Sequence, residues 1–346
     1  MLILGIETSC DETSVALLEN EKVIDMKVLS QLSHSDWGGV IPEIASREHL
    51  REIVNLTNEL FEKPDYGLKD IELIACTNEP GLIGALLIGM SFGKSLAAGL
   101  SVPFVPVNHI QAHLYSSFLE VRRPPFPFLS LIVSGGHTIL VLVEDYFKHK
   151  VLGTTVDDAA GEAFDKVAKM LGLGYPGGPL IDKFAKTGNE NFHKFPIARL
   201  KKDSNNNYSY NFSFSGIKTS VLYYLRKINF EENKDEKLIS DICASFQKAV
   251  VESLIDRTLF AADEYNIRNI SISGGVSANS YLKKKFLELE KINYNIFIPS
   301  LKYSTDNGAM IGLTGYYKYI HTKDKSFYES ESFKVPAKPR LVLNEL

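Results

Sequence analysis

The chain repeats one structural plan, and this internal repeat limits its possible folds more than any other feature. Each copy opens with an apolar strand, a small polar turn and a returning strand. These are residues 2–7, 8–13 and 14–19 in the first copy, and residues 128–133, 134–137 and 138–144 in the second. Each copy continues with a strand, a polar loop, a helix and a further strand. These are residues 72–77, 78–81, a helix from about Gly84 and residues 104–107, then residues 269–273, 274–279, a helix to about Leu289 and residues 295–299.

Two copies of this plan predict two similar α/β domains that face each other across a cleft. The 346 residues, 45% of them hydrophobic, are enough for two cores. Prolines 124, 125 and 127 stiffen the connection and exclude a helix. We therefore place the boundary near Pro125, with domains 1–125 and 126–346, and the C-terminal helix can complete the first. The polar turns should lie where turn N–H groups and helix N-termini favour phosphate.

Composition excludes several classes of protein. Cys10, Cys76 and Cys243 are far apart and form no Cys-x-x-Cys pair, which argues against disulfides and thiolate metal sites and fits a reducing cytoplasm. The N-terminus lacks the basic region of a signal peptide. Residues 84–100 are apolar but include Lys94 and four glycines, so we expect a buried helix there and no membrane span. With a net charge of −4, contact with nucleic acid requires a local basic patch or a partner.

Two histidines give the clearest indication of chemistry. His109 and His113 are four residues apart, so on a helix both imidazoles leave the same face and can share one metal ion. Ordinary half-buried histidines also occur at this spacing. Position 110 is Ile, so the pair lacks the glutamate of the zinc-protease His-Glu-x-x-His helix. Asp306 follows residues 303–305 at a helix start, where it is either a cap or a third metal ligand.

Glycine-rich segments suggest loops that could bind a ligand. Gly93-Lys94-Ser95 resembles the end of a P-loop, but Ile88 replaces the required earlier glycine, which rejects a Walker site. The pairs Gly135-Gly136 and Gly274-Gly275 are either simple turns or ligand loops, and their equivalent positions in the two copies favour ligand binding.

Three further segments keep two interpretations each. A helix should begin at Asp157, where Asp157 and Asp158 complement its dipole, an explanation that fits Asp165 less well. The break at residues 175–179 is structural or brings backbone amides to a ligand. Residues 186–211, with Arg199, Lys201 and Lys202, form a solvated loop or a surface that faces nucleic acid.

Six segments, in this order, resemble one family. They are Gly5 to Thr13, Asn108 to His113, Val133 to His137, Phe212 to Thr219, Gly274 to Asn279 and Thr305 to Met310. On these motifs the chain is similar to the tRNA adenosine threonylcarbamoyltransferases (TsaD), formerly described as O-sialoglycoprotein endopeptidases, over about residues 1–320. The resemblance implies an actin-like ATPase fold of two ribonuclease-H-like domains around a central cleft.

The resemblance also implies a reaction. Family members transfer a threonylcarbamoyl group from threonylcarbamoyl-adenylate (threonylcarbamoyl-AMP) to the exocyclic amine of the adenosine 3′ of the anticodon, in tRNAs that read codons beginning with A. It implies one divalent metal per subunit, Fe²⁺ or alternatively Zn²⁺, bound by His109, His113 and Asp306. The residues implied to bind the adenylate are Ile132, Val133, Ser134, Gly135, Gly136, Asp165, Gly178, Asp182 and Asn279. The implied partners are tRNA, a paralogous scaffold subunit (TsaB-like) and a small ATPase (TsaE-like), in the cytoplasm.

The catalytic residues are our own hypothesis. We expect Ser9, Asp11 and Glu12, with the Ser134 loop, to line the reaction space, and His109→Ala to abolish transfer with little loss of folding. Two alternatives remain open. One is a small-molecule kinase of the same superfamily, which would normally use Mg²⁺ and carboxylates. The other is a non-catalytic scaffold paralogue, which should lack the histidine pair. A peptidase is disfavoured, because the sequence shows neither the arrangement of a catalytic nucleophile nor that of a zinc-bound water with a base.

Overall fold

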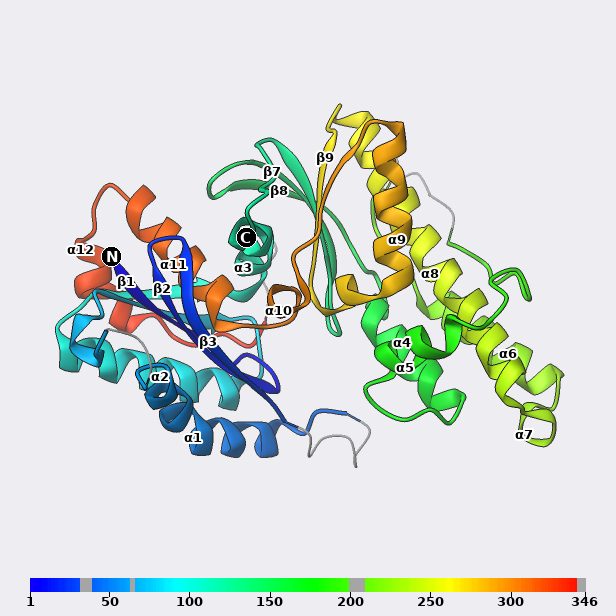
Figure 1. The fold of residues 1–346 in the computed structure, drawn as a ribbon, viewed down its shortest axis with the longest axis horizontal. Helices are drawn as coiled ribbons and strands as arrows, with labels where there is room; N and C mark the ends of the chain where they lie inside the picture. Colours follow the sequence, from blue (N-terminus) through cyan, green and yellow to red (C-terminus); the bar gives the residue numbers. More distant parts are fainter. Residues whose placement is uncertain (32–38, 63–65, 199–208, 341–346) are drawn as a thin grey trace. The chain divides into compact units, whose positions relative to one another are not determined.

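The computed structural model of the chain divides into two compact units, residues Met1–Arg123 with Pro299–Leu346, and residues Pro124–Ile298. It describes all residues except 32–38, 63–65, 199–208 and 341–346 (Figure 1). The described residues of the segment 299–346 therefore belong to the first unit. The sequence prediction placed the domain boundary between residues 125 and 126, and it allowed the C-terminal helix to complete the first domain. Arg199, Lys201 and Lys202 lie outside the described residues.

The first unit is built on a five-stranded sheet in the order β3-β2-β1-β4-β5. Its strands are β1 (Leu2–Glu7), β2 (Glu12–Glu19), β3 (Lys22–Ser30), β4 (Leu73–Glu79) and β5 (Phe104–Asn108). The pairs β1/β2 and β2/β3 are antiparallel, and the pairs β1/β4 and β4/β5 are parallel. The long β3 was not predicted from the sequence.

Helices cover both faces of this sheet (Figure 1). The described helices are α1 (Pro42–Glu59), α2 (Ile83–Leu100), α3 (His109–Tyr115), α10 (Leu301–Ser304), α11 (Gly308–His321) and α12 (Ser326–Glu329), with 3₁₀ turns η2 (Leu68–Asp70), η3 (Ser116–Leu119) and η6 (Glu331–Lys334). Leu4 and Ile6 of β1 share a core with Met90 of α2 and Ile53 of α1. A Cβ on Gly5 would lie 2.1 Å from the Gly308 carbonyl oxygen, so only glycine lets α11 lie this close to β1.

Helix α2 is long and apolar enough to cross a membrane by length and composition alone, a test that core helices of soluble proteins also pass. It packs against β4 and α1. One face, which includes Leu86, Met90 and Ala97, is buried, while Ile83 and Leu87 on the other face are about half exposed. The helix that the sequence predicted as buried is therefore buried on one side.

The second unit repeats the plan with a sheet in the order β10-β9-β6-β7-β8. Its strands are β6 (Phe128–Val133), β7 (Thr138–Asp145), β8 (Lys148–Thr154), β9 (Asn269–Ser273) and β10 (Asn295–Phe297). The pairs β6/β7 and β7/β8 are antiparallel, while β9 runs parallel to both β6 and β10. When the strands are numbered along the chain within each unit, both sheets have the order third, second, first, fourth, fifth. The parallel and antiparallel pairs are also the same in both sheets, which confirms the predicted duplication.

The helices of the second unit are α4 (Ala160–Met170), α5 (Gly177–Ala185), α6 (Ser215–Lys227), α7 (Phe230–Asn233), α8 (Glu236–Glu264) and α9 (Ser280–Glu288), with 3₁₀ turns η4 (Gly275–Ala278) and η5 (Leu289–Ile292). The prediction that a helix begins at Asp157 was wrong, because α4 begins at Ala160. Asp157 instead accepts hydrogen bonds from the backbone N–H groups of Phe214 and Ser215, at the start of α6. Asp158 pairs with Lys166 and Lys218.

Candidate metal centre and substrate loops

The two histidines lie on one side of the short helix α3, and the N-cap residue Asn108 fixes where this helix begins. Asn108 ends β5, and its side-chain oxygen accepts hydrogen bonds from the backbone N–H groups of Ile110 (2.9 Å) and Gln111 (3.1 Å). The helix therefore begins at His109. The spacing of four residues brings the rings of His109 and His113 together, with their centroids 4.7 Å apart.

Asp306 reaches the same point from the start of α11. The next residue, Asn307, caps that helix by accepting a hydrogen bond from the Met310 backbone N–H at 2.9 Å. Asp306 Oδ1 lies 3.4 Å from His109 Nε2 and 3.1 Å from His113 Nε2. One donor atom from each of the three residues lies within 4.8 Å of the other two. All three residues belong to the first unit.

These three donors fit a divalent transition metal. Two imidazole nitrogens and one carboxylate oxygen suit iron or zinc and leave coordination positions open. An ion at about 2.1 Å from each donor of a tetrahedral set holds the donors roughly 3 to 3.5 Å apart. The distances from Asp306 Oδ1 to both imidazoles, 3.4 and 3.1 Å, lie in that range.

Glu7 is a residue of this site that the sequence analysis did not identify. Its carboxylate lies 2.8 Å from His109 Nδ1, the ring nitrogen that points away from Asp306, and it also accepts a hydrogen bond from Thr77 Oγ1 at 2.8 Å. A carboxylate behind a metal-binding imidazole fixes the ring and its tautomer. The available signal was a single acidic residue in the otherwise apolar strand β1, where all six residues are buried.

The ionisable groups of this cluster shift one another's pKa values. Burial opposes the charged form of His109, but the carboxylates of Asp306 and Glu7 raise its pKa well above the ordinary value. Burial likewise opposes charge on Asp306, yet the neighbouring His109 and His113 lower the pKa of that carboxyl well below its usual range. With His109 in its neutral form, the carboxylates of Glu7, which is buried, and of Asp306, which is partly exposed, provide negative charge that a cation can occupy.

Of the predicted catalytic residues, Ser9 and Asp11 lie in the loop that joins β1 to β2, and Glu12 is the first residue of β2. Ser9 Oγ is 3.2 Å from His109 Nδ1. The pKa of Glu12 is raised well above its ordinary value, first by burial and then by the charges of Asp306 and Asp11. The sequence-predicted residues of the first unit are thus brought together around α3.

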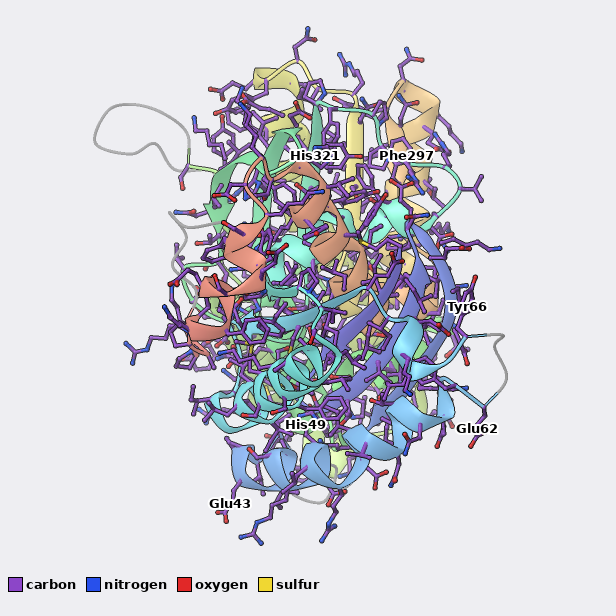
Figure 2. All side chains as sticks on the ribbon, turned by 90° about the vertical axis from the view of Figure 1, so that its left-hand side faces the viewer. Glu43, His49, Glu62, Tyr66, Phe297 and His321 are labelled. Carbon is purple, nitrogen blue, oxygen red and sulfur yellow. The ribbon has the colours of Figure 1, made fainter. Side chains whose placement is uncertain are left out.

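A buried histidine of α1 fixes the same loop. His49 Nδ1 lies 2.7 Å from Thr13 Oγ1, and its Nε2 lies 2.9 Å from the Cys10 carbonyl oxygen. Figure 2 labels His49 and Glu43, both of α1; His49 is fully buried and Glu43 is exposed. Helix α1 therefore supports the segment from Cys10 to Thr13, which bears Asp11 and Glu12.

In the second unit, the predicted substrate residues begin at the turn between β6 and β7. Ile132 and Val133 are the last two residues of β6 and are buried, so only their backbone can meet a ligand. The Ser134 side chain accepts a hydrogen bond from the His137 backbone N–H at 3.1 Å and closes the turn. Gly135 and Gly136 are exposed, and a Cβ on either would meet no atom within 4 Å. Their backbone is open to an approaching ligand.

The second glycine loop packs against this turn. Gly274 has φ +87°, and a Cβ there would lie 2.5 Å from the Val133 carbonyl oxygen. Both the conformation and the close approach require glycine. The loop from Gly274 to Asn279 is therefore held beside the end of β6.

The remaining predicted substrate residues connect the helices behind these loops. Asp165 of α4 accepts a hydrogen bond from the backbone N–H of Gly177, the neighbour of Gly178, at 2.7 Å. Asp182 of α5 accepts one from Ser280 Oγ at 2.8 Å, next to Asn279. These hydrogen bonds link α4 to the first residue of α5, and α5 to the start of α9, next to Asn279.

Comparison with known proteins identifies the family. The family model described as TsaD, tRNA N6-adenosine threonylcarbamoyltransferase, matches residues 22–313. The chain belongs to this family. It is 48% identical to the tRNA N6-adenosine threonylcarbamoyltransferase of Chloroherpeton thalassium, over 97% of this chain and 96% of that protein. It is 50% identical to the enzyme of the same description from Thermosipho africanus, over 92% of this chain and 94% of that protein.

Membership in the threonylcarbamoyltransferase family makes the protein a transferase that modifies adenosine N6 in tRNA, as the sequence motifs predicted. Solved structures show the fold. Full-length HypF in its phosphate- and nucleotide-bound form aligns with a TM-score of 0.58 at 15% identity, over 93% of this chain and 56% of that chain. Component A of the Acidaminococcus fermentans (R)-2-hydroxyglutaryl-CoA dehydratase aligns with a TM-score of 0.51 at 14% identity, over 92% and 99%. The actin-like ATPase fold is thereby confirmed.

Proposed function

We propose that the protein uses threonylcarbamoyl-adenylate as its donor and modifies the adenosine 3′ of the anticodon in tRNAs that read codons beginning with A. In this reaction the exocyclic amine forms a bond to the carbamoyl carbon, the bond from that carbon to the phosphate oxygen breaks, and AMP leaves as one N–H proton is lost. The observation that carries the proposal is the convergence of His109, His113 and Asp306 in a chain of this family.

The metal we propose is one Fe²⁺ per chain, with Zn²⁺ as the alternative. When bound, such an ion supplies a Lewis acid that can polarise a carbonyl and orient the substrate. His109, His113 and Asp306 would hold it, and Glu7 would keep the His109 ring in the orientation that points Nε2 at the ion. Ser9, Asp11 and Glu12 would line the space beside it.

The second unit provides features suited to the nucleotide half of the donor. The exposed backbone of Gly135 and Gly136 can donate N–H groups to phosphate, and Gly178 lies at the N-terminal turn of α5, where backbone N–H groups also favour an anion. Asp165 and Asp182 are suited to sugar hydroxyls, because each carboxylate can accept further hydrogen bonds beyond the one described. Positioning matters here since an adenosine amine is a poor nucleophile.

Partners and location are also part of the proposal. We propose that the protein acts in the cytoplasm with tRNA, a paralogous scaffold subunit and a small ATPase. Helices α1 and α2 pack together and expose apolar side chains at spacings of four residues, Leu50 (63% exposed) and Val54 on α1, and Ile83 and Leu87 on α2. Such a surface is suited to a protein partner, and we assign it to the scaffold subunit.

A pair of variants tests this assignment. Leu50→Asp should weaken binding of the scaffold subunit in size-exclusion chromatography, because it places a charge one helical turn from the exposed Val54 on α1. Leu301→Asp, at the 69%-exposed leucine of α10, is the matched control. Equal binding by both variants would assign the scaffold to another surface.

The transferase proposal is tested by labelling. Purified protein is supplied with threonylcarbamoyl-adenylate, made from labelled threonine, and with unmodified tRNA and the candidate partners, before and after removal of metal. We expect the tRNA to become labelled, the labelling to stop when the metal is removed, and Fe²⁺ or Zn²⁺ to restore it. Labelling that is unaffected by stripping would refute the metal role, and absence of labelling under all conditions would refute the choice of donor.

A further inference from the structure

Gln247 is a buried polar residue to which neither the reaction nor the family motifs assign a role. It lies in the long helix α8 and is 3% exposed. Its side chain lines a cavity of about 240 Å³, together with Lys186, Ser280, Tyr281 and Lys284. A buried amide of this kind must satisfy its hydrogen bonds or present them to a ligand.

The orientation of the Gln247 amide follows from a chain of hydrogen bonds that starts at a backbone group. The Leu282 N–H of α9 can only donate, and it donates to Asn279 Oδ1 at 2.9 Å. The other end of the Asn279 amide must then be Nδ2, and it donates to Gln247 Oε1 at 2.6 Å. Each amide orientation is thereby fixed by the previous one.

Asn279 is thus held at both ends of its amide, by a helix N-terminus and by Gln247. One N–H of its Nδ2 remains after the bond to Gln247. Ser280, the next residue, is bonded to Asp182. Gln247 thus contacts Asn279, and Asp182 contacts the next residue, Ser280; both Asn279 and Asp182 are proposed to bind the adenylate.

We propose that Gln247 is a positioning residue for threonylcarbamoyl-adenylate, which fixes the Asn279 amide so that its free N–H is offered to the nucleotide in one orientation. This inference rests on the proposed donor and on the role of Asn279 in binding it. A donor that is fixed before binding costs less ordering free energy when the ligand arrives. The effect should therefore fall on binding and leave the chemical step unchanged.

Two variants separate positioning from direct contact. Gln247→Ala removes the hydrogen bond from Asn279 Nδ2 to Gln247. Because one net hydrogen bond is lost, the KM for threonylcarbamoyl-adenylate should rise roughly three- to tenfold, and kcat should stay within about twofold. Gln247→Glu keeps an oxygen that accepts from Asn279 Nδ2, and Lys186 and Lys284 on the same cavity can balance its charge. It should retain a KM near that of the unsubstituted enzyme.

A double variant tests the route of the effect. If Gln247 acts through Asn279, adding Gln247→Ala to Asn279→Ala should not raise KM beyond that of Asn279→Ala alone. Binding of AMP measured by calorimetry should follow the same order, without partners or metal. Unchanged KM in Gln247→Ala would overturn the inference, and so would additive effects in the double variant or a loss in Gln247→Glu equal to that in Gln247→Ala.

Folding and function are controlled separately. A purely structural role for Gln247 would lower Tm and kcat together at constant KM, and that result would refute the positioning role. If the unsubstituted enzyme does not use threonylcarbamoyl-adenylate, the proposed function fails first. If it does, and Asn279→Ala raises KM while Gln247→Ala does not, only the inference about Gln247 fails.

Discussion

The two units share one fold but prepare their candidate sites in opposite ways. The first unit concentrates ionisable side chains that are mostly buried, with Glu7 paired to His109, and with His109 and His113 both next to Asp306. The second unit offers backbone, with glycines at the turn after β6 and the loop after β9, and polar side chains that mainly tie helix ends together. A duplicated scaffold can thus hold a metal-type site in one copy and a nucleotide-type site in the other.

This contrast predicts different sensitivities. In the first unit, function should depend on the identity of individual side chains, because each donor atom has one geometry. In the second unit, function should depend on keeping the backbone exposed, because the main-chain groups are the same for every residue type. The variants described below test each half of this comparison.

Loss of a metal-binding histidine should have the largest effect. His113→Ala removes one of the three metal donors and should abolish the transfer activity. Loss of a residue that only orients a metal ligand lowers metal affinity roughly 10- to 100-fold, and loss of a ligand itself should lower it more. Metal content by mass spectrometry and labelled transfer measure both. His321→Ala, at the exposed end of α11, controls for loss of an imidazole (Figure 2). A normal metal content in His113→Ala would contradict the three-donor site.

The structure makes His113 a cleaner test than His109. His109→Ala was predicted from the sequence to fold normally, but His109 also pairs with the buried Glu7. Removing its ring would leave a buried carboxylate without that partner, which is strongly destabilising. Thermal unfolding should therefore show a lower Tm for His109→Ala than for His113→Ala.

Glu7→Gln should have the next largest effect. The substitution keeps the shape of the side chain but removes the charge behind His109, and we expect metal affinity to fall roughly 10- to 100-fold. Competition with a chelator of known affinity gives the value. Thr77→Val removes one of the other hydrogen bonds to the same carboxylate, which also accepts one from the Ser9 backbone N–H, and it leaves the charge, so it should have a smaller effect. An unchanged metal affinity in Glu7→Gln would show that His109 is oriented without it.

A pair of glycine variants tests the second unit. A Cβ on Gly161 would lie 2.6 Å from the Ser134 carbonyl oxygen, so Gly161→Ala should destabilise the protein by about 1 to 3 kcal/mol. A Cβ on Gly135 would meet nothing within 4 Å, so Gly135→Ala should leave Tm unchanged and raise the KM for the adenylate. Thermal unfolding and donor titration separate the two. A Gly135→Ala enzyme with normal KM would remove this turn from the proposed nucleotide site.

The sequence predicted what depends on local patterns. The duplicated plan was visible because apolar strands such as β1 and β6 end in polar turns. The strands β3 and β8 were not predicted, because both are edge strands whose residues are largely half-buried or exposed and include several lysines. The role of Asp157 could not be predicted locally, because it caps a helix that begins 58 residues later.

A glycine pattern in the sequence supports the option that the C-terminal helix completes the first domain. Gly308, Gly312 and Gly315 form a stripe on α11, and a Cβ on each would lie within 2.8 Å of an atom of the first sheet. Small residues at this spacing indicate a helix packed closely on another element. Which sheet receives them is a tertiary choice, and Gly5 of β1 supplies the matching surface.

The smallest predicted effect concerns a lysine of the first unit that lies away from the metal-binding candidates. Lys318 of α11 donates a hydrogen bond to the Pro106 carbonyl oxygen at 3.3 Å. Burial lowers its pKa to about 8, against a weaker opposing effect of Glu79. Its folded-state pKa is thus below the value of about 10.4 expected in the unfolded chain.

Between pH 8 and about 10.4 the unfolded chain binds more protons at Lys318 than the folded protein does, so stability from this group rises with pH across that interval. Below pH 8 the cost of the buried charge is present in full, at about 1 to 3 kcal/mol. Lys318→Met should therefore be more stable than the unsubstituted protein at pH 7 by up to that amount, less the lost bond to Pro106. The difference should shrink as pH rises towards 10.4. Urea unfolding at pH 7 and pH 10 measures it, and Lys323→Met, at an exposed lysine, controls for the lost charge. If the stability difference between Lys318→Met and the unsubstituted protein is constant with pH, Lys318 is hydrated in the folded protein. The buried charge that distinguishes the first unit from the exposed backbone of the second would then be confined to the cluster of metal-binding candidates.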